Sequence, residues 1–135
     1  MKQEYPDQYI CFRLNKAMRV IQRYYERHLT PLGITPSQFY VLSYLWVNNE
    51  AKFKDLAKSV NIEGSTLTGI LDRLERNRFI LRQDDPEDRR SIVISLTAKA
   101  REVIPQGMEF VRQLDAEVLR NLLPMNMIKP FKRLY

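Results

Sequence analysis

Two adjacent arginines, Arg89 and Arg90, lie in a short polar segment, Asp85–Arg90, that also holds one proline and three acids. An arginine guanidinium carries five donors in a rigid fork, which matches phosphate oxygens and the acceptor edge of guanine. Asp-Pro among acids is typical of a turn, and the next residues, Ser91–Ser95, alternate polar and apolar as a strand does. The pattern predicts a β-hairpin whose tip presents paired cations, a device that can reach into a DNA groove.

Within this turn, Arg90 is the residue that we expect to enter the minor groove. Asp88 is expected to orient the Arg90 guanidinium through a bidentate pair, and Arg89 is expected to contact phosphate. The alternative interpretation is an ordinary charged hairpin turn. A helix-turn-helix upstream of the turn favours DNA binding.

A second group of candidate DNA-contacting residues opens a predicted helix upstream of the turn. Hydroxyl and small side chains there permit close approach to bases and phosphates, and an arginine follows one turn later. The group consists of Ser65, Thr66, Thr68, Gly69 and Arg73. One alternative is that Ser65 and Thr66 only cap the helix. Another is that Arg73 forms a salt bridge with Asp72, with Glu75 or with a neighbouring helix.

Catalytic chemistry has little support in the sequence. His28 is the only histidine and Cys11 the only cysteine, so there is no cluster with zinc-ligand spacing and no nucleophile with a separate base. No glycine-rich phosphate-binding motif is present either. We therefore expect no enzyme activity, no metal and no cofactor.

Cys11 has two open interpretations. It lies near the start of the first predicted helix, where the helix dipole favours a thiolate, so it is a candidate redox sensor. The alternative is that Cys11 is a small buried apolar residue.

Composition limits the class of protein. The 135 residues, 44% hydrophobic and 28% charged, are typical of one folded domain. No apolar run of about 18 residues offers a membrane span, no signal peptide is recognisable, and the single cysteine fits a cytoplasmic setting. The net charge is +6, yet the segment Glu63–Arg90 holds six basic and seven acidic residues. This balance favours individually placed arginines over a general basic patch.

The elements that must position these residues are mostly helices. Apolar residues recur at helical spacing from Ile10 to Leu29, and Thr35–Gln38 forms a capping box with proline at the first helical position. A short helix over Phe53–Val60 and the helix that carries Ser65 are joined by a tight turn. This is a helix-turn-helix, whose second helix enters the major groove. The apolar face of that second helix consists of Leu67, Ile70, Leu71 and Leu74.

Downstream, Phe79–Gln83 and Ser91–Ser95 are the predicted strands on either side of the arginine turn. Thr97 is expected to cap a long helix that runs towards Leu123. A last helical piece is expected between Pro124 and Tyr135.

This order of elements, with the stretch LDRLERNRFILRQDDPEDRRSIVISLT and above all Asp88-x-Arg90 followed by Leu96-Thr97, resembles the MarR family of winged helix-turn-helix transcriptional regulators. The resemblance covers nearly the whole chain. It implies a mainly α fold with a small β-wing and one domain over residues 1–135. Residues 1–34 and 98–135 are then dimerisation helices, and residues 36–96 are the DNA-binding lobe.

The resemblance also implies a function and partners. It implies a homodimeric, sequence-specific repressor that binds an inverted-repeat operator in double-stranded DNA and is released by a small ligand. The aromatic residues of the expected ligand cleft are Tyr24, Tyr25, His28, Tyr40, Tyr44 and Trp46, and core packing is the alternative for them.

Two details modify this picture. The run Ile10-Cys11-Phe12-x-Leu14 is similar to the organic-peroxide-sensing branch of the family, which gives a second function, a thiol-based repressor that uses Cys11. The same resemblance implies Tyr25 as a tyrosine that the sensor thiol contacts. Cys11 and Tyr25 are about 21 Å apart along one helix, so their contact requires a second subunit. Such proteins commonly have glycine after the recognition helix where this chain has Arg78, so Asn77 is expected to take the left-handed cap. A hypothesis of another class is a winged-helix module that binds a protein partner and no DNA.

Overall fold

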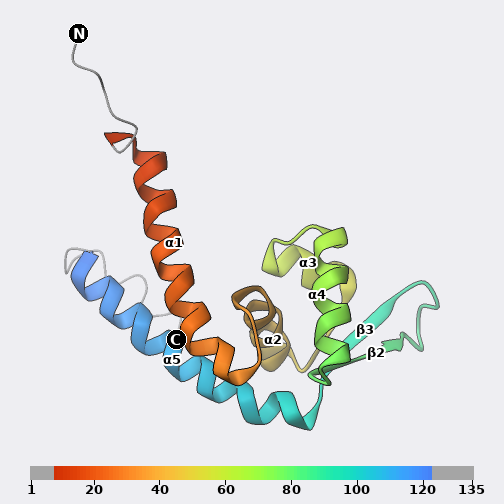
Figure 1. Ribbon diagram of the computed structural model, residues 1–135. Helices are drawn as coiled ribbons and strands as arrows, with labels where there is room; N and C mark the ends of the chain where they lie inside the picture. Colours follow the sequence, from red (N-terminus) through yellow and green to blue (C-terminus); the bar gives the residue numbers. More distant parts are fainter. Residues whose placement is uncertain (1–7, 123–135) are drawn as a thin grey trace.

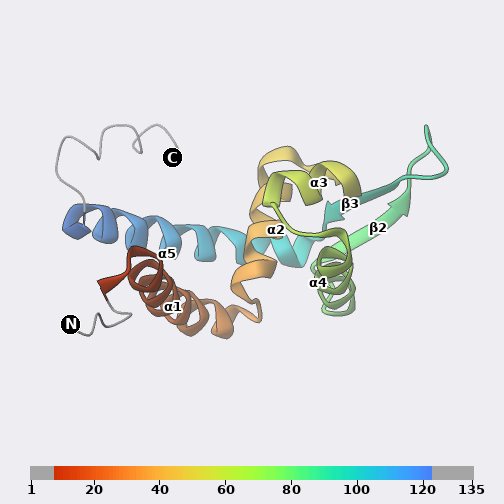
Figure 2. The ribbon, with the colours of Figure 1, turned by 90° about the horizontal axis from the view of Figure 1, so that it is seen from above.

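The computed structural model describes residues 8–122, with side chains described to residue 117. The helices α1 (Ile10–Leu29) and α5 (Ala98–Leu122) contact each other and form an elongated arm, and the other helices and the sheet form a lobe at one end of it (Figures 1 and 2). The helix predicted between Pro124 and Tyr135 lies outside the described residues.

Helix α1 buries little of its surface in this chain. Only Tyr25 and Leu29, near its end, are buried. A 3-10 turn, η2 (Thr30–Leu32), follows, and Gly33 at φ 77° reverses the chain, a conformation that suits glycine. The large apolar side chains that α1 leaves exposed are Ile10, Phe12, Leu14, Met18, Val20 and Tyr24.

Helix α2 (Pro36–Asn48) starts at the predicted capping box. The Thr35 hydroxyl accepts a hydrogen bond from the Gln38 N–H at 3.2 Å, and the Gln38 side chain accepts one from the Thr35 N–H at 3.0 Å. These two bonds satisfy donors that a helix start otherwise leaves unpaired. The helix buries Phe39, Leu42 and Leu45 in the core.

The predicted helix-turn-helix is confirmed. Helix α3 (Phe53–Val60) ends at Asn61, which takes the left-handed conformation at φ 53°, and α4 (Gly64–Arg76) follows. All four residues of the predicted apolar face of α4 are buried. Each fully buried leucine stabilises the fold by about 1.5–3 kcal/mol, so this face is fixed against the core and the opposite face of α4 is left for a partner.

The sheet has one strand more than we predicted. Its strands are β1 (Glu50–Lys52), β2 (Ile80–Asp84) and β3 (Ile92–Leu96), all antiparallel, in the order β1-β3-β2. Strands β2 and β3 each begin one residue later than predicted. The sequence did not indicate β1, because three residues are too few to show an alternating pattern.

The end of α4 corrects the expectation for Asn77. Arg78 takes the left-handed conformation at φ 63°, whereas Asn77 has φ −84°. The Phe79 N–H donates to the Leu74 carbonyl at 2.9 Å, and the Arg78 N–H donates to an α4 carbonyl one residue further on. This pair of bonds requires the left-handed residue directly before Phe79, which is Arg78.

Thr97 joins the end of α4 to the start of α5. Its hydroxyl donates to the Arg78 carbonyl at 2.6 Å and accepts from the Ala100 N–H at 3.3 Å, which confirms its predicted role as a helix cap. The ammonium of Lys99, the second residue of α5, donates to the Asn77 carbonyl at 2.8 Å. These bonds tie the start of α5 to the end of α4.

None of the helices within residues 8–122 has the combined length and apolar character of a membrane span.

Candidate nucleic-acid interface

The structure places the two predicted groups on neighbouring elements of the lobe. Helix α4 carries the first group, and the turn between β2 and β3 carries the second, at the tip of a hairpin that extends beyond the helices (Figures 1 and 2). All of these residues are exposed except Gly69, which is half-buried: Ser65, Thr66, Thr68, Gly69, Arg73, Asp88, Arg89 and Arg90.

The start of α4 is not capped by its hydroxyl residues. The N-cap position is Glu63, without a capping side chain, so the alternative role of Ser65 and Thr66 as caps is not seen. The Thr68 hydroxyl donates to the Gly64 carbonyl at 2.9 Å. Because its single proton is used there, the Thr68 oxygen is left as an acceptor, which suits a base amino group better than a phosphate.

Gly69 is not required for packing within the chain. A Cβ built at this position meets no atom within 4 Å. Glycine in the middle of a helix costs about 1 kcal/mol relative to alanine. The missing side chain leaves the α4 backbone at Gly69 open to close approach by a partner.

The salt bridge expected as an alternative for Arg73 is also not formed. Asp72 and Glu75 both pair with Arg82 of β2, at 2.8 and 3.0 Å. The Arg82 hydrogen bond to Glu75 holds the pKa of that carboxyl below its usual value. Arg73 is exposed and takes no part in the salt bridges of the described side chains.

The wing turn corrects the expected pair of Asp88 and Arg90. The Asp88 carboxylate accepts a hydrogen bond from the Arg90 backbone N–H at 3.0 Å and makes no salt bridge with its guanidinium. In a turn, an aspartate side chain commonly accepts a hydrogen bond from the backbone N–H two residues later, and this bond closes an Asx-turn. Asp88 therefore fixes the backbone at Arg90 and leaves the Arg90 side chain exposed.

Asp85 is a site residue that the sequence did not reveal. Its carboxylate, only 6% exposed, accepts from the Glu87 N–H at 3.0 Å and lies 3.1 Å from the Lys52 ammonium. The Glu87 N–H and then Lys52 hold the pKa of Asp85 below its usual value. Asp-Pro indicated a turn, but nothing indicated Lys52 as its partner because β1 was not predicted.

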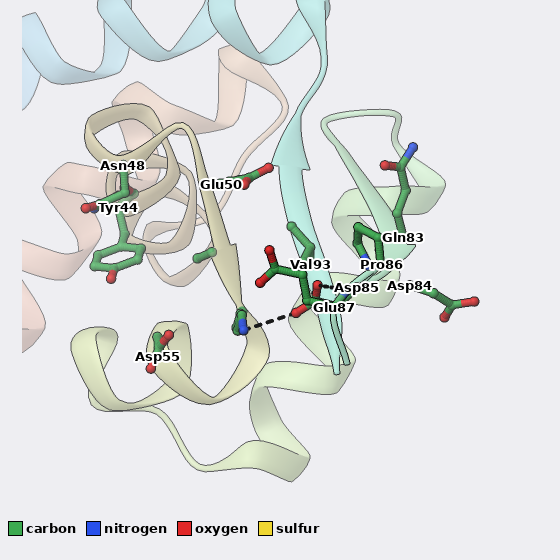
Figure 3. A pocket seen from close by; sticks show the side chains of 12 residues that line it. Tyr44, Asn48, Glu50, Asp55, Gln83, Asp84, Asp85, Pro86, Glu87 and Val93 are labelled. Atoms are coloured by element: carbon green, nitrogen blue, oxygen red, sulfur yellow. Dashed lines mark hydrogen bonds and ion pairs between the residues drawn. The ribbon is translucent and has the colours of Figure 1, made fainter. Parts of the chain in front are cut away.

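The Asp85 carboxylate lies beside a cavity of about 560 Å³ between the wing, β1 and the end of α2 (Figure 3). The acids among its lining residues are Glu50, Asp55, Asp84, Asp85 and Glu87. In the described part of the chain, no three side chains are grouped as metal ligands.

A second cavity, of about 550 Å³, lies between the arm and the lobe. Three of the six aromatic residues predicted for a ligand cleft line it: Tyr25, Tyr40 and Tyr44. The Tyr25 hydroxyl donates to Asp115 of α5 at 3.0 Å, and burial, followed by the charge of Asp115, raises the pKa of Tyr40.

The other three aromatic residues are used differently. The His28 ring stacks between the rings of Tyr24 and of Phe110 of α5. Its centroid lies 5.5 Å from that of Tyr24 and 3.8 Å from that of Phe110. Trp46 packs, half-buried, against the core. Core packing, the alternative interpretation, accounts for Trp46, whereas Tyr24 and His28 are exposed on the arm.

Cys11 and Tyr25 lie in different environments. Cys11 is exposed on α1, so it is not a buried core residue of this chain, whereas Tyr25 is buried against α5. No contact of the two residues within one subunit is formed, as the helix geometry predicted.

A helix-turn-helix followed by a β-hairpin with an arginine tip defines a winged helix-turn-helix protein. Comparison with known proteins gives the family. The sequence model of the MarR family matches residues 34–92. The chain is 30% identical over 98 residues to the HTH-type transcriptional regulator MgrA of Staphylococcus aureus, covering 72% of this chain and 67% of that protein. The chain belongs to the MarR family.

A second relative is the organic hydroperoxide resistance transcriptional regulator of Bacillus subtilis. It is 34% identical over 88 residues, which cover 65% of this chain and 60% of that protein. The chain thus spans about three fifths of the length of the Bacillus subtilis relatives that it matches.

A solved structure agrees with the fold. A cysteine-to-serine variant of MarR from E. coli, complexed with operator DNA, superposes with a TM-score of 0.79 at 25% identity. The alignment covers 98% of this chain and 96% of that one.

Proposed function

We propose that the chain acts as a homodimeric, sequence-specific DNA-binding repressor of transcription. Helix α4 enters the major groove, and the wing carries Arg90 into the adjacent minor groove. The observation that carries this proposal is the exposed face of α4, with its hydroxyls, Gly69 and Arg73, beside a hairpin tip with Arg89 and Arg90. None of these three arginines forms a salt bridge with another described residue.

The distribution of charge supports DNA binding more strongly than the residue count does. Three of the seven acids in Glu63–Arg90 form ion pairs with other described residues, Asp72 and Glu75 with Arg82, and Asp85 with Lys52. The arginines of the segment that take no part in described salt bridges are Arg73, Arg76, Arg78, Arg89 and Arg90. The net charge of the segment stays −1, but outside these ion pairs it holds five arginines and four acids, a small excess of arginine.

The exposed apolar residues of α1 support a dimer. A single helix that presents this many large apolar side chains to water marks an interaction surface. In the proposed assembly, residues 1–34 and 98–135 form the dimer, and residues 36–96 form the lobe that binds DNA. A twofold dimer presents two α4 helices to two half-sites about 34 Å apart, which is why the operator is an inverted repeat.

The cavity between arm and lobe supports release by a small aromatic ligand. Tyr40 and Tyr44 of α2 and Met108 of α5 line it, so a ligand there contacts both parts of the molecule. The bonds of Thr97 and Lys99 then carry a displacement of α5 to the end of α4. A changed separation of the two α4 helices misaligns them with the half-sites.

A second candidate function is a thiol-based, peroxide-sensing repressor. The exposed Cys11 and the similarity to the organic hydroperoxide resistance regulator favour it. In this version, oxidation of Cys11 near Tyr25 of the other subunit replaces the ligand as the signal that releases DNA.

DNA upstream of the protein's own gene provides the test. We expect a labelled upstream fragment to be shifted in a gel, with unlabelled fragment competing better than the same length of unrelated DNA. Equal competition by both DNAs would indicate non-specific binding only, and no shift with either would favour the module that binds a protein partner.

A further inference from the structure

The pair of Asp85 and Lys52 joins two parts of the lobe that are distant in the sequence. Lys52 ends β1 and is the N-cap residue of α3, the first helix of the helix-turn-helix. Asp85 is the first residue after β2 and opens the wing turn. Strand β3 lies between β1 and β2 in the sheet, so the ion pair spans the central strand. Figure 3 marks it with a dashed line.

Asp85 also holds the turn itself together. Its N–H donates to the Ser91 carbonyl at 3.0 Å, and its own carbonyl accepts from the Asp88 N–H at 3.3 Å. Its carboxylate accepts from the Glu87 N–H at 3.0 Å. The five residues Pro86–Arg90, which include both wing arginines, thus lie between Asp85 and its hydrogen-bond partner Ser91.

We propose that Asp85, through Lys52, is a positioning residue for the wing arginines in DNA binding. It does not touch DNA: its side chain is buried, and it holds the turn that carries Arg89 and Arg90 at a fixed place relative to α3 and α4. This inference rests on the proposed DNA-binding function. It adds that the ion pair holds the wing in a fixed position against the helix-turn-helix.

The proposal and bulk electrostatics predict opposite results for one substitution. Asp85→Asn removes a negative charge close to the wing, which on electrostatic grounds alone strengthens binding to polyanionic DNA. If Asp85 positions the wing, the same substitution weakens binding, because the amide forms no ion pair with Lys52. We expect a loss of affinity of about fivefold or more.

Asp84→Asn is the matched control. Asp84 is adjacent in sequence, exposed, absent from the described salt bridges and drawn with its carboxylate pointing away from the Asp85 ion pair (Figure 3). Operator affinity is measured by fluorescence anisotropy for the full chain and both variants. We expect Asp84→Asn to bind as tightly as the unmodified protein or more tightly.

Substitutions at Lys52 keep the proposal testable if Asp85→Asn fails to fold. Lys52 is 48% exposed, so its replacement leaves the core intact. We expect Lys52→Gln to weaken operator binding and Lys52→Arg to bind like the unmodified protein. In a plot of log affinity against log salt concentration, we expect Lys52→Gln to keep the slope of the unmodified protein. A slope smaller in magnitude by about 1 would identify Lys52 as a phosphate contact and overturn the proposal.

The double variant completes the test. If the two residues act as one unit, adding Lys52→Gln to a folded Asp85→Asn protein costs no further affinity. Additive losses, or equal binding by Asp85→Asn and Asp84→Asn, would overturn the positioning role. If the unmodified protein itself shows no sequence-specific binding, the proposed function fails instead, so the two failures are distinguishable.

Discussion

The Arg82 guanidinium of β2 donates two hydrogen bonds to the Glu75 carboxylate of α4, at 3.0 and 3.1 Å. A third contact, at 2.8 Å, is with Asp72 one turn earlier on the same helix. This fork fixes the first strand of the wing along α4 and engages both acids that flank Arg73. Together with the pair of Asp85 and Lys52, it ties β2 to the helix-turn-helix at two points.

Replacing Arg82 tests this link. Arg82→Met keeps much of the apolar stem but leaves Asp72 and Glu75 as neighbouring, uncompensated acids, so we expect a melting temperature a few degrees lower and weaker operator binding. Released acids beside Arg73 repel phosphate and compete for its guanidinium. Calorimetry and anisotropy measure the two effects, and an unchanged affinity would show that the fork is a stability feature only.

Glu75 gives a prediction about pH. Its pKa in the folded protein is lower than its ordinary value of 4.5, so the unfolded chain binds the proton more readily. The stabilisation is therefore fully present above about pH 4.5 and is lost as the pH falls through the folded pKa. We expect acid unfolding curves of Glu75→Gln to be flatter over this range than those of the unmodified protein. Parallel curves would contradict the assignment.

Gly69→Ala separates stability from binding. The added methyl meets open space, and alanine is the better helix former, so the variant should be more stable by about 1 kcal/mol. If DNA approaches this face of α4, the same methyl weakens operator binding. Chemical denaturation and anisotropy together give the answer, and an increase in stability with full affinity would place DNA elsewhere on the helix.

Arg90→Ala tests the wing directly. We expect operator affinity to fall about tenfold, because a guanidinium in the minor groove is lost, and the dimer to remain intact in sedimentation. Arg27→Ala is the control for charge alone, since Arg27 is exposed on α1, away from the wing (Figure 1). Equal losses in both variants would show that net charge governs binding.

Cys11→Ser distinguishes the two modes of regulation. If Cys11 is the sensor, organic peroxide releases the unmodified protein from DNA and leaves Cys11→Ser bound. If a ligand in the cavity is the signal, both proteins respond to peroxide in the same way. A gel shift with and without peroxide measures this difference.

Elements with strong local signals were predictable from the sequence. The capping box at Thr35, the apolar face of α4 and the cap at Thr97 each depend on residues a few positions apart, and all three are confirmed. Asp88 was recognised as part of the turn, but its choice of the Arg90 backbone over the side chain depends on the local path of the chain.

The contacts that join distant segments were not predictable. Lys52 and Asp85 meet only because the three-residue strand β1 pairs with β3, and Arg82 meets Glu75 only because β2 packs beside α4. The Arg78 carbonyl likewise accepts a hydrogen bond from the hydroxyl of Thr97, a residue 19 positions later in the chain. No pattern within a single sequence segment encodes these partners.

Selection from a pool of random-sequence duplexes, with the full chain as bait, tests sequence-specific recognition by a dimer most directly. We predict enrichment of an inverted repeat with half-site centres about 10 base pairs apart, two chains per duplex, and loss of the enrichment with a variant that combines Arg73→Ala and Arg90→Ala. No enriched motif, or the same motif selected by the variant, would contradict DNA recognition through α4 and the wing.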